Sequence, residues 1–265
     1  MLKRKTLLVV LALIVMLSMA LSACGAGNAG NTLRVGVDNT YPPMEYTNDK
    51  NETIGFDIDL TNEIAKKLNM KLELIPNAWD GIFLALDTDK FDCIISSVSL
   101  KADRLENYEF TKPYIANAQV IVVGAGTDSI KETKDLAGKK VGVQLNTTAD
   151  ESTAKYLEEV KFEITKYDQI IQCFSDLKAG RLDAVVVDEV VARYYVAQDK
   201  DSYKVTSAKL TNEPIGVCFK KGNTALRDKV QKAIDELKAA GTLKTLSEKW
   251  FGEDITSNID EKLRE

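Results

Sequence analysis

The chain has no histidine and only four cysteines among its 265 residues. Ser-His-Asp and Cys-His catalysis need an imidazole, and zinc and facial-triad iron sites usually do, so we expect no catalytic residue, no metal ligand and no cofactor. Three cysteines, Cys93, Cys173 and Cys218, are odd in number, widely spaced and set in apolar or helical sequence. This pattern predicts buried free thiols rather than a disulfide framework.

The N-terminal apolar run is too short for a membrane-spanning helix. It extends from Leu7 to Leu21 and follows the basic residues Lys3, Arg4 and Lys5. A short apolar run with a basic flank, followed by small residues, is typical of a secretory signal. Residues 1–23 are therefore predicted to be removed on export.

The four residues Leu21, Ser22, Ala23 and Cys24 resemble the lipobox of bacterial lipoproteins. The resemblance implies that the Cys24 thiol carries fatty acyl chains such as palmitate and anchors the mature chain to the membrane. The alternative is an ordinary signal with a chance cysteine behind it. Residues 24–31 are rich in glycine, which predicts a flexible tether.

Acidic side chains outnumber basic ones. Removing residues 1–23 takes three basic side chains from 35 and no acidic ones from 40, which leaves 32 against 40 and a formal net charge of −8. An acidic body is poorly suited to bind nucleic acid or anionic lipid, so neither is an expected partner, and the acyl chain would be the link to the membrane. The remaining length suits one large domain or two modest ones.

Beyond residue 32, short β-branched runs alternate with amphipathic helical patterns, which predicts an α/β fold with largely parallel sheets. The expected strands are Leu33–Val37, Leu72–Ile75, Cys93–Ser96, Val120–Val123, Val141–Gln144, Asp183–Val187 and Ile215–Phe219. The expected helices are Phe56–Leu68, Ile82–Leu86, Ala149–Leu157, Gln169–Ala179, Glu189–Gln198 and Ala225–Ala240. A capping-box pattern from Thr148 to Glu151 predicts that a helix starts there. Residues 253–265 are charged and are expected to be frayed.

A weak internal repeat indicates two similar α/β units. Val35–Asp38 recurs as Val141–Gln144, and Leu86–Ser97 recurs as Leu177–Asp188. The match puts Ser97 and Asp188 at equivalent positions, at the carboxyl ends of strands. Because ligands of open α/β sheets bind outside those ends, we expect a site in a cleft between two facing units.

Three motifs point to a known family. They are Gly55–Leu60 followed by Ile64, Ala65 and Leu68; Ser96–Ser99 followed by Arg104; and Val187–Glu189. Together, over about Leu33 to Gly252, they resemble the extracellular amino-acid-binding proteins of bacterial ABC importers.

The resemblance implies a two-lobed "Venus flytrap" of the type II periplasmic-binding-protein fold, each lobe a mixed, mostly parallel sheet flanked by helices. Its expected limits are residues 32–119 and 216–256 for lobe 1, 120–215 for lobe 2, and 257–265 for a C-terminal tail, with crossings near Ala118–Val122 and Thr211–Gly216. The expected partners are a free polar amino acid, which is cationic, amide or cystine-like, and the permease subunits of an ABC transporter, and the protein is expected to be a monomer.

An amino acid is a zwitterion, so its site needs donors for one end and an acceptor for the other. Arg104 can supply a bidentate fork, and in the family this position holds the ligand α-carboxylate, assisted by backbone N–H groups near Thr147 and Thr148. The capping box would put those amides at a helix N-terminus, which favours an anion. The alternative for Arg104 is a solvated residue paired with Asp103 or Glu106.

The acceptor is expected at Asp188, which follows a strand of buried type where an isolated carboxylate would be costly. The family role of this residue is to receive the ligand α-ammonium, with help from the Ser97 backbone and the Ser99 hydroxyl. The alternative is a helix N-cap, and both roles can hold together.

Recognition of the ligand side chain is expected from Tyr41 and Trp79, which stand where the family places aromatic walls. Each could instead belong to the core of a lobe. Asp38 could receive a cationic or amide side chain, and Glu45 is a weaker candidate. Asn146 departs from the glycine common in the family at that position, so a larger residue there is expected to narrow the pocket.

Other interpretations have less support. The serines at 96, 97 and 99 have no Gly-x-Ser-x-Gly elbow and no base, and Gly124–Gly126 lacks the rest of a phosphate-binding fingerprint. A dehydratase acting on prephenate- or arogenate-like acids would need a tuned general acid, Glu45 or Asp38, which the sequence does not mark. An amino-acid sensor on the same fold stays a second alternative.

Overall fold

The structure, a computed structural model, describes residues 32–264. The predicted signal peptide, the lipidation site at Cys24 and the tether at 24–31 lie outside these residues. Within the described range, no helix is both long and apolar enough to cross a membrane.

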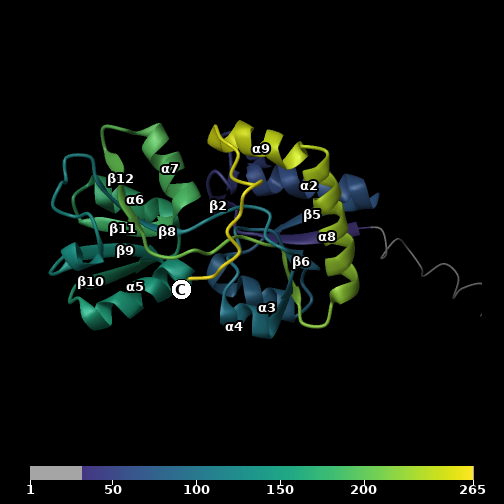
Figure 1. Ribbon diagram of the computed structural model, residues 1–265, viewed down its shortest axis with the longest axis horizontal. Helices are drawn as coiled ribbons and strands as arrows, with labels where there is room; N and C mark the ends of the chain where they lie inside the picture. The colour runs from purple at the N-terminus through teal and green to yellow at the C-terminus, as the bar shows by residue number, and fades with distance from the viewer. Residues whose placement is uncertain (1–31, 265) are drawn as a thin grey trace, which may run out of the picture. The chain divides into compact units, whose positions relative to one another are not determined.

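Lobe 1, as we call it, is built on a five-stranded sheet of order β5-β1-β6-β13-β7 (Figure 1). Its strands are β1 (Thr32–Val37), β5 (Lys71–Pro76), β6 (Cys93–Ile94), β7 (Tyr108–Phe110) and β13 (Cys218–Lys220). Its helices are α2 (Phe56–Leu68), η1 (Trp79–Gly81), α3 (Ile82–Asp87), α4 (Ala102–Asn107), α8 (Thr224–Ala239) and α9 (Thr242–Phe251). Three short strands, β2 (Thr40–Tyr41), β3 (Glu45–Thr47) and β4 (Thr53–Ile54), form a separate antiparallel sheet. Segments from both ends of the described chain thus share one lobe.

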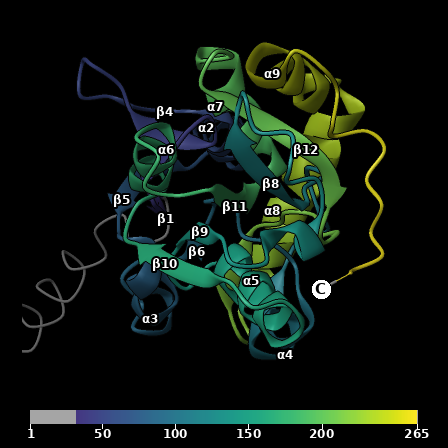
Figure 2. The same ribbon diagram turned by 90° about the vertical axis from the view of Figure 1, so that its left-hand side faces the viewer.

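Lobe 2 is built on a second five-stranded sheet, of order β10-β9-β11-β8-β12. Its strands are β8 (Gln119–Gly124), β9 (Lys140–Gln144), β10 (Glu163–Tyr167), β11 (Ala184–Asp188) and β12 (Tyr203–Lys209). Its helices are η2 (Thr133–Leu136), α5 (Thr148–Glu159), α6 (Ile170–Lys178) and α7 (Glu189–Gln198), which lie around the sheet in Figure 2. All five residues of the central strand β11 are buried, as its unbroken apolar run predicts.

The internal repeat has a structural basis in the parallel pairs β1/β6 and β9/β11. The backbone N–H of Arg34 donates to the carboxylate of Asp92 at 2.9 Å, and in lobe 2 the N–H of Lys140 donates to that of Asp183 at 2.8 Å. In each pair a strand glycine makes room for the residue before that aspartate. A Cβ on Gly36 would lie 2.4 Å from the Phe91 ring. The two lobes therefore start from the same supersecondary unit.

The same close fit recurs in lobe 2, where a Cβ on Gly142 would lie 2.4 Å from Cδ1 of Leu182. Leu182 occupies the repeat position of Phe91. A methyl group at either glycine would overlap a buried side chain, so both positions require glycine for space rather than for backbone freedom.

Both sheets are mixed because each includes a strand that runs against its parallel core. β8 is antiparallel to β11, and β13 is antiparallel to β6. The α/β two-lobed fold predicted from the sequence is confirmed.

The chain passes between the sheets twice, and the two crossings pair with each other. The N–H of Ile215 donates to the carbonyl of Ile115, and that of Glu213 to the carbonyl of Asn117, each at 3.0 Å. We call 115–119 the first crossing and 210–215 the second crossing. The residue limits of the two lobes stay a prediction.

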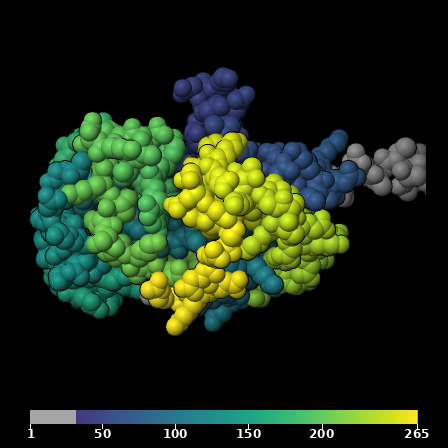
Figure 3. Space-filling model, turned by 45° about the horizontal axis from the view of Figure 1, so that its top comes forward, coloured from purple at the N-terminus to yellow at the C-terminus, as the bar shows by residue number. Residues whose placement is uncertain are grey.

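The C-terminal segment is not frayed over the residues that the structure describes, so that expectation was wrong. The carbonyl of Ile255 accepts from the N–H of Ala116 in the first crossing at 3.0 Å, and Asn212 in the second crossing exchanges two backbone hydrogen bonds with Arg264. The Asn212 side chain also donates to the carbonyl of Asp260 at 2.9 Å. The unpaired edges of the crossings provide these partners, and Figure 3 shows the C-terminal segment (yellow) lying along the boundary with lobe 2.

Several elements were not predicted from the sequence. They are β2, β3, β4, β7, β10, β12, η1, η2, α4 and α9. Most are short or half-exposed, so their apolar periodicity is weak. The predicted strand at 93–96 ends at Ile94, and the one at 215–219 begins as an isolated bridge at Ile215 before β13. The three cysteines are free and buried, as predicted.

Candidate binding site

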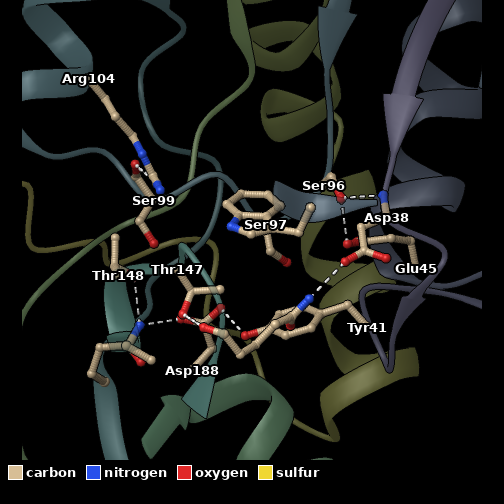
Figure 4. Close-up of a pocket in the computed structure, with 14 residues that line it drawn as sticks. Asp38, Tyr41, Glu45, Ser96, Ser97, Ser99, Arg104, Thr147, Thr148 and Asp188 are labelled. Carbon is tan, nitrogen blue, oxygen red and sulfur yellow. Dashed lines mark hydrogen bonds between the residues drawn. The ribbon is translucent and has the colours of Figure 1, made fainter. Parts of the chain in front are cut away.

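A pocket lies at the carboxyl ends of the parallel strands, between the two lobes (Figure 4). All nine side chains predicted to bind a ligand line it. They are Asp38, Tyr41, Trp79, Ser97, Ser99, Arg104, Thr147, Thr148 and Asp188. Five further lining residues were not in that set, and they are Glu45, Ser96, Gln119, Gln144 and Ala149.

The Arg104 guanidinium is buried, with 6% of the residue exposed, although α4 is otherwise a surface helix. Its Nη1 donates to the carbonyl of Ser99 at 3.1 Å, and its Cζ lies 5.0 Å from the ring centroid of Phe83 and 5.6 Å from that of Trp79. Within residues 32–264 it forms no ion pair, so the solvated pairing considered from the sequence is contradicted. Burial lowers the pKa of this guanidinium, and the nearby Glu151, Glu213 and Asp103 act in the opposite direction.

The N-terminus of α5 faces the pocket from lobe 2. The sequence predicted a cap at Thr148, but the cap is Thr147, whose Oγ1 accepts from the N–H of Asp150 at 3.2 Å. The Asp150 carboxylate accepts in turn from the N–H of Asn146 at 3.1 Å. The backbone of Asn146 has φ 59°, a left-handed conformation that explains why glycine suits this position. The first amides of α5 thus stand beside the pocket as orphan donors.

Asp188 ends β11 and is 5% exposed. It occupies the N-cap position of α7, but its side chain makes no capping hydrogen bond, so the capping alternative is contradicted. Its Oδ2 accepts from the hydroxyl of Tyr41 at 2.8 Å, and its Oδ1 accepts from the amides of Asn117 and Gln119 at 2.6 Å each. Burial raises the pKa of this carboxyl to about 6, against the effect of these three donors.

Tyr41 and Trp79 line the pocket and also belong to buried hydrophobic clusters. The Tyr41 hydroxyl bonds Asp188 across the cleft, and the indole N–H of Trp79 donates to the carbonyl of Asn146 at 2.9 Å. Both therefore connect lobe 1 to lobe 2. The Lys101 ammonium makes a third such connection, an ion pair with Glu151 of α5.

At the other end of the pocket, Asp38 presents its carboxylate beside Gln144. The Gln144 amide donates to Asp38 Oδ2 at 3.0 Å and to the carbonyl of Asp168 at 3.2 Å. Its own oxygen, Oε1, is buried and has no hydrogen-bond partner in the described part of the chain. The polar atoms left over at this end are therefore acceptors.

Glu45 belongs to a buried carboxyl pair with Asp57. Burial and the neighbouring Asp57 charge raise the pKa of Glu45 well above its ordinary value. Burial also raises the pKa of Asp57 to about 6. The carboxylate of Asp57 accepts from the backbone N–H of Ser97 at 2.8 Å, which holds that residue at φ 49° beside the pocket. The sequence did not mark Glu45 as tuned, because its partner lies in another element.

The Ser96 hydroxyl is engaged within lobe 1, whereas the buried Ser97 hydroxyl has no hydrogen-bond partner among the described residues. The Ser96 hydroxyl donates to Glu45 at 2.7 Å and accepts from the N–H of Asp38 at 2.9 Å. Within the described residues, no group of three or more Cys, Asp or Glu side chains is arranged to hold a metal ion.

Fold and site together define a two-lobed α/β binding protein whose pocket is closed by both lobes. Residues 33–253 match the bacterial extracellular solute-binding proteins, family 3, and the chain belongs to this family.

Three comparisons place the chain further. It is 37% identical over 226 residues to the L-cystine-binding protein TcyJ of Escherichia coli (strain K12), covering 85% of this chain and 84% of that protein. An ancestral arginine-binding protein bound to arginine superposes with a TM-score of 0.80 at 41% identity, covering 84% of this chain and 99% of the other. The ancestral amino acid-binding protein AncCDT-1, a precursor of cyclohexadienyl dehydratase, gives 0.78 at 36%, covering 83% and 96%.

Proposed function

We propose that the protein captures an amino acid with a cationic side chain outside the cytoplasm and delivers it to the permease of an ABC importer. The observation that carries this proposal is that one buried pocket contains both a carboxylate and a guanidinium that forms no ion pair within the described residues. Arg104 lies on lobe 1 and Asp188 on lobe 2, and the amides of α5 stand beside the pocket. These groups suit the α-carboxylate and α-ammonium of a zwitterion.

The preference for a cationic side chain follows from the far end of the pocket. Asp38 offers a carboxylate there, and Gln144 offers an oxygen that has no partner among the described residues. A guanidinium has five N–H donors in a plane and stacks on aromatic rings such as Tyr41 and Trp79. Arginine is therefore the ligand that we place first, with lysine next. Cystine would bring a second carboxylate towards Asp38, so we place it below both.

Closure of the lobes would join the two halves of the site across the ligand, because Arg104 and Asp188 come from different lobes. A ligand that contacts both halves favours the closed state by the free energy of the extra contacts made there. In this proposal lobe 1 comprises residues 32–119 and 216–256, lobe 2 comprises 120–215, and the crossings act as the hinge.

We further propose that the mature protein is a monomer held at the membrane by acyl chains on Cys24. The support is the lipobox-like sequence that ends at this residue. Intact-mass analysis of membrane-extracted protein is expected to show a mass increase for acylation at Cys24 that the Cys24→Ser variant lacks. Equal masses, apart from the substitution, would refute the anchor.

Two measurements test the binding proposal. The first is a thermal-shift screen of the twenty amino acids and cystine, in which a ligand at a hundred times its Kd stabilises the fold by about 2.7 kcal/mol. Calorimetry of the hits is expected to rank arginine first, with a stoichiometry of one. The matched control is Gln231→Leu, which removes a half-buried amide that does not line the pocket and should leave this ranking unchanged.

The second measurement addresses the enzyme alternative, which the raised pKa of Glu45 keeps worth testing. Its carboxyl is engaged with Asp57 and Ser96, so we expect no turnover of prephenate or arogenate. Turnover of either acid, or no stabilisation by any amino acid, would overturn the proposed function.

A further inference from the structure

Two carboxamides on the first crossing hold the carboxylate of Asp188. Asn117 Nδ2 and Gln119 Nε2 each lie 2.6 Å from the same oxygen, Oδ1. Both amides are buried, with 5% of Asn117 and 1% of Gln119 exposed. The resemblance to the family named neither residue, and Asn117 does not line the pocket.

Strand register brings these groups together. In the antiparallel pair β8/β11, Gln119 is the direct partner of Asp188. Asn117 precedes it by two residues, and extended chain returns to the same face with a period of two. A carboxylate at the end of β11 therefore meets two side chains of the segment that connects the lobes.

The orientation of the Gln119 amide is fixed by its neighbours. Its Nε2 also lies 3.0 Å from Thr148 Oγ1 and 3.5 Å from Glu213 Oε2, so acceptors surround the nitrogen. The other atom of each amide, Asn117 Oδ1 and Gln119 Oε1, is buried without a hydrogen-bond partner among the described residues. Because the two oxygens accept no hydrogen bond among the described residues, the hydrogen bonds donated by the nitrogens are what compensates for the burial of both amides.

The charge of Asp188 depends on these contacts. Burial and the nearby Glu213 carboxyl raise its pKa, the Asn117, Tyr41 and Gln119 hydrogen bonds lower it, and the net result is about 6. Tyr41 and Glu213 are the titratable groups that face Asp188 from β2 and the second crossing. Burial raises the pKa of Tyr41 well above its ordinary value, so its hydroxyl stays a donor.

We propose that Asn117 and Gln119 are positioning residues for Asp188, whose carboxylate they keep charged and turned towards the pocket. The first crossing thus contributes to the binding of the ligand's ammonium group through Asp188. This inference rests on the proposed function, in which Asp188 receives that group.

The first test needs no ligand. Carboxyl-carbon NMR follows the titration of Asp188 in the wild type, with Asp188→Asn to assign the signal, and then in Asn117→Leu and Gln119→Leu. We expect the midpoint to rise from about 6 by about one pH unit in each variant, the size expected for losing one charge-assisted hydrogen bond. Gln231→Leu, which removes a half-buried amide that bonds Asp235 and the N–H of Lys112 and does not line the pocket, should leave it in place.

The second test is calorimetry with arginine between about pH 5.5 and 8.5. Relative to wild type, each variant is expected to bind roughly tenfold more weakly at the acidic end and to approach wild-type affinity at the basic end, where Asp188 ionises in all of them. If Gln119→Leu does not fold, Gln119→Met keeps the length of the side chain and replaces it.

The outcomes separate the two proposals. A midpoint that moves by less than about 0.3 unit, or an affinity loss equal at every pH, would show a packing role only and overturn this inference. Failure of the wild type to bind any amino acid would refute the proposed function, while the NMR titration would still decide the role of the two amides.

Discussion

Replacing Arg104 by methionine separates a binding role from a structural one. A binding role predicts a loss of affinity with unchanged or higher stability, whereas a structural role predicts a loss of stability with little change in affinity. Methionine keeps an unbranched apolar stem against Phe83 and Trp79 but removes the buried charge. In the unliganded protein the guanidinium has one hydrogen bond, to the Ser99 carbonyl, and no ion pair within the described residues. The buried charge therefore destabilises the folded protein until an anion binds to it.

The magnitudes follow from these contacts. A bidentate guanidinium–carboxylate pair makes two charge-assisted hydrogen bonds, each contributing about 1.5–3 kcal/mol. Arg104→Met is thus expected to weaken binding by about 3–6 kcal/mol, roughly a factor of 10² to 10⁴. The free energy of unfolding without ligand is expected to stay unchanged or to rise by about 1 kcal/mol, because desolvation of the charge is relieved.

Calorimetry with arginine measures the first quantity, and urea unfolding of the unliganded protein measures the second. Arg104→Lys is the companion variant, since it keeps the charge but loses the planar fork and should recover only part of the affinity. The reasoning is refuted if Arg104→Met binds within about threefold of wild type while losing more than about 2 kcal/mol of stability.

The remaining predictions concern the fold. The pKa of Asp188 is about 6 in the folded protein and 3.8 in the unfolded chain. The folded state therefore holds the proton more tightly, and the contribution of Asp188 to the free energy of unfolding of the unliganded protein is highest below about pH 4. It falls by up to about 3 kcal/mol as the pH rises through 6 and Asp188 ionises. Tm measured across this range should show the trend, and Asp188→Asn should flatten it. Gly36→Ala drives a Cβ into Phe91 and should cost about 1–3 kcal/mol in urea unfolding. Truncation after Ser257 removes the hydrogen bonds between the tail and Asn212 and should cost about 1–3 kcal/mol by the same assay.

Each of these three predictions has its own control. Gly126→Ala adds a methyl group where no atom lies within 4 Å, so it should leave stability close to wild type, and a loss equal to that of Gly36→Ala would contradict the packing argument. Asn212→Ala in the full-length chain should reproduce part of the truncation effect. A pH profile that Asp188→Asn leaves unchanged would assign the slope to other carboxyls.

The elements that could be predicted from the sequence have a strong local signal. Phe56–Leu68 and Glu189–Gln198 were predicted with the bounds observed, because their apolar spacing shows the helical period clearly. The repeat between the lobes was visible because the same strand-to-strand contacts need the same residue types twice. The candidate ligand residues were recognised from short motifs that carry Arg104 and Asp188 within a few positions of regular elements.

Other features depend on segments that meet only in the fold. Glu45 and Asp57 lie on separate elements, and nothing local shows that they form one buried pair in which burial raises both pKa values. Gln144 faces Asp38 only because the two lobes approach each other. The prediction for the C-terminal segment was wrong because a run of charged residues does not show that the unpaired edges of the crossings will form hydrogen bonds with its backbone.

From the chain alone one can determine the α/β class, the doubled unit, the exported character implied by its first residues and the two groups expected to bind a zwitterion. Only the tertiary structure decided which polar groups support them, above all the amides of Asn117 and Gln119 against Asp188. The physical reason is that the charge and aim of a buried carboxylate are set by donors within hydrogen-bond distance, and strand register and lobe approach, not sequence proximity, determine which donors those are.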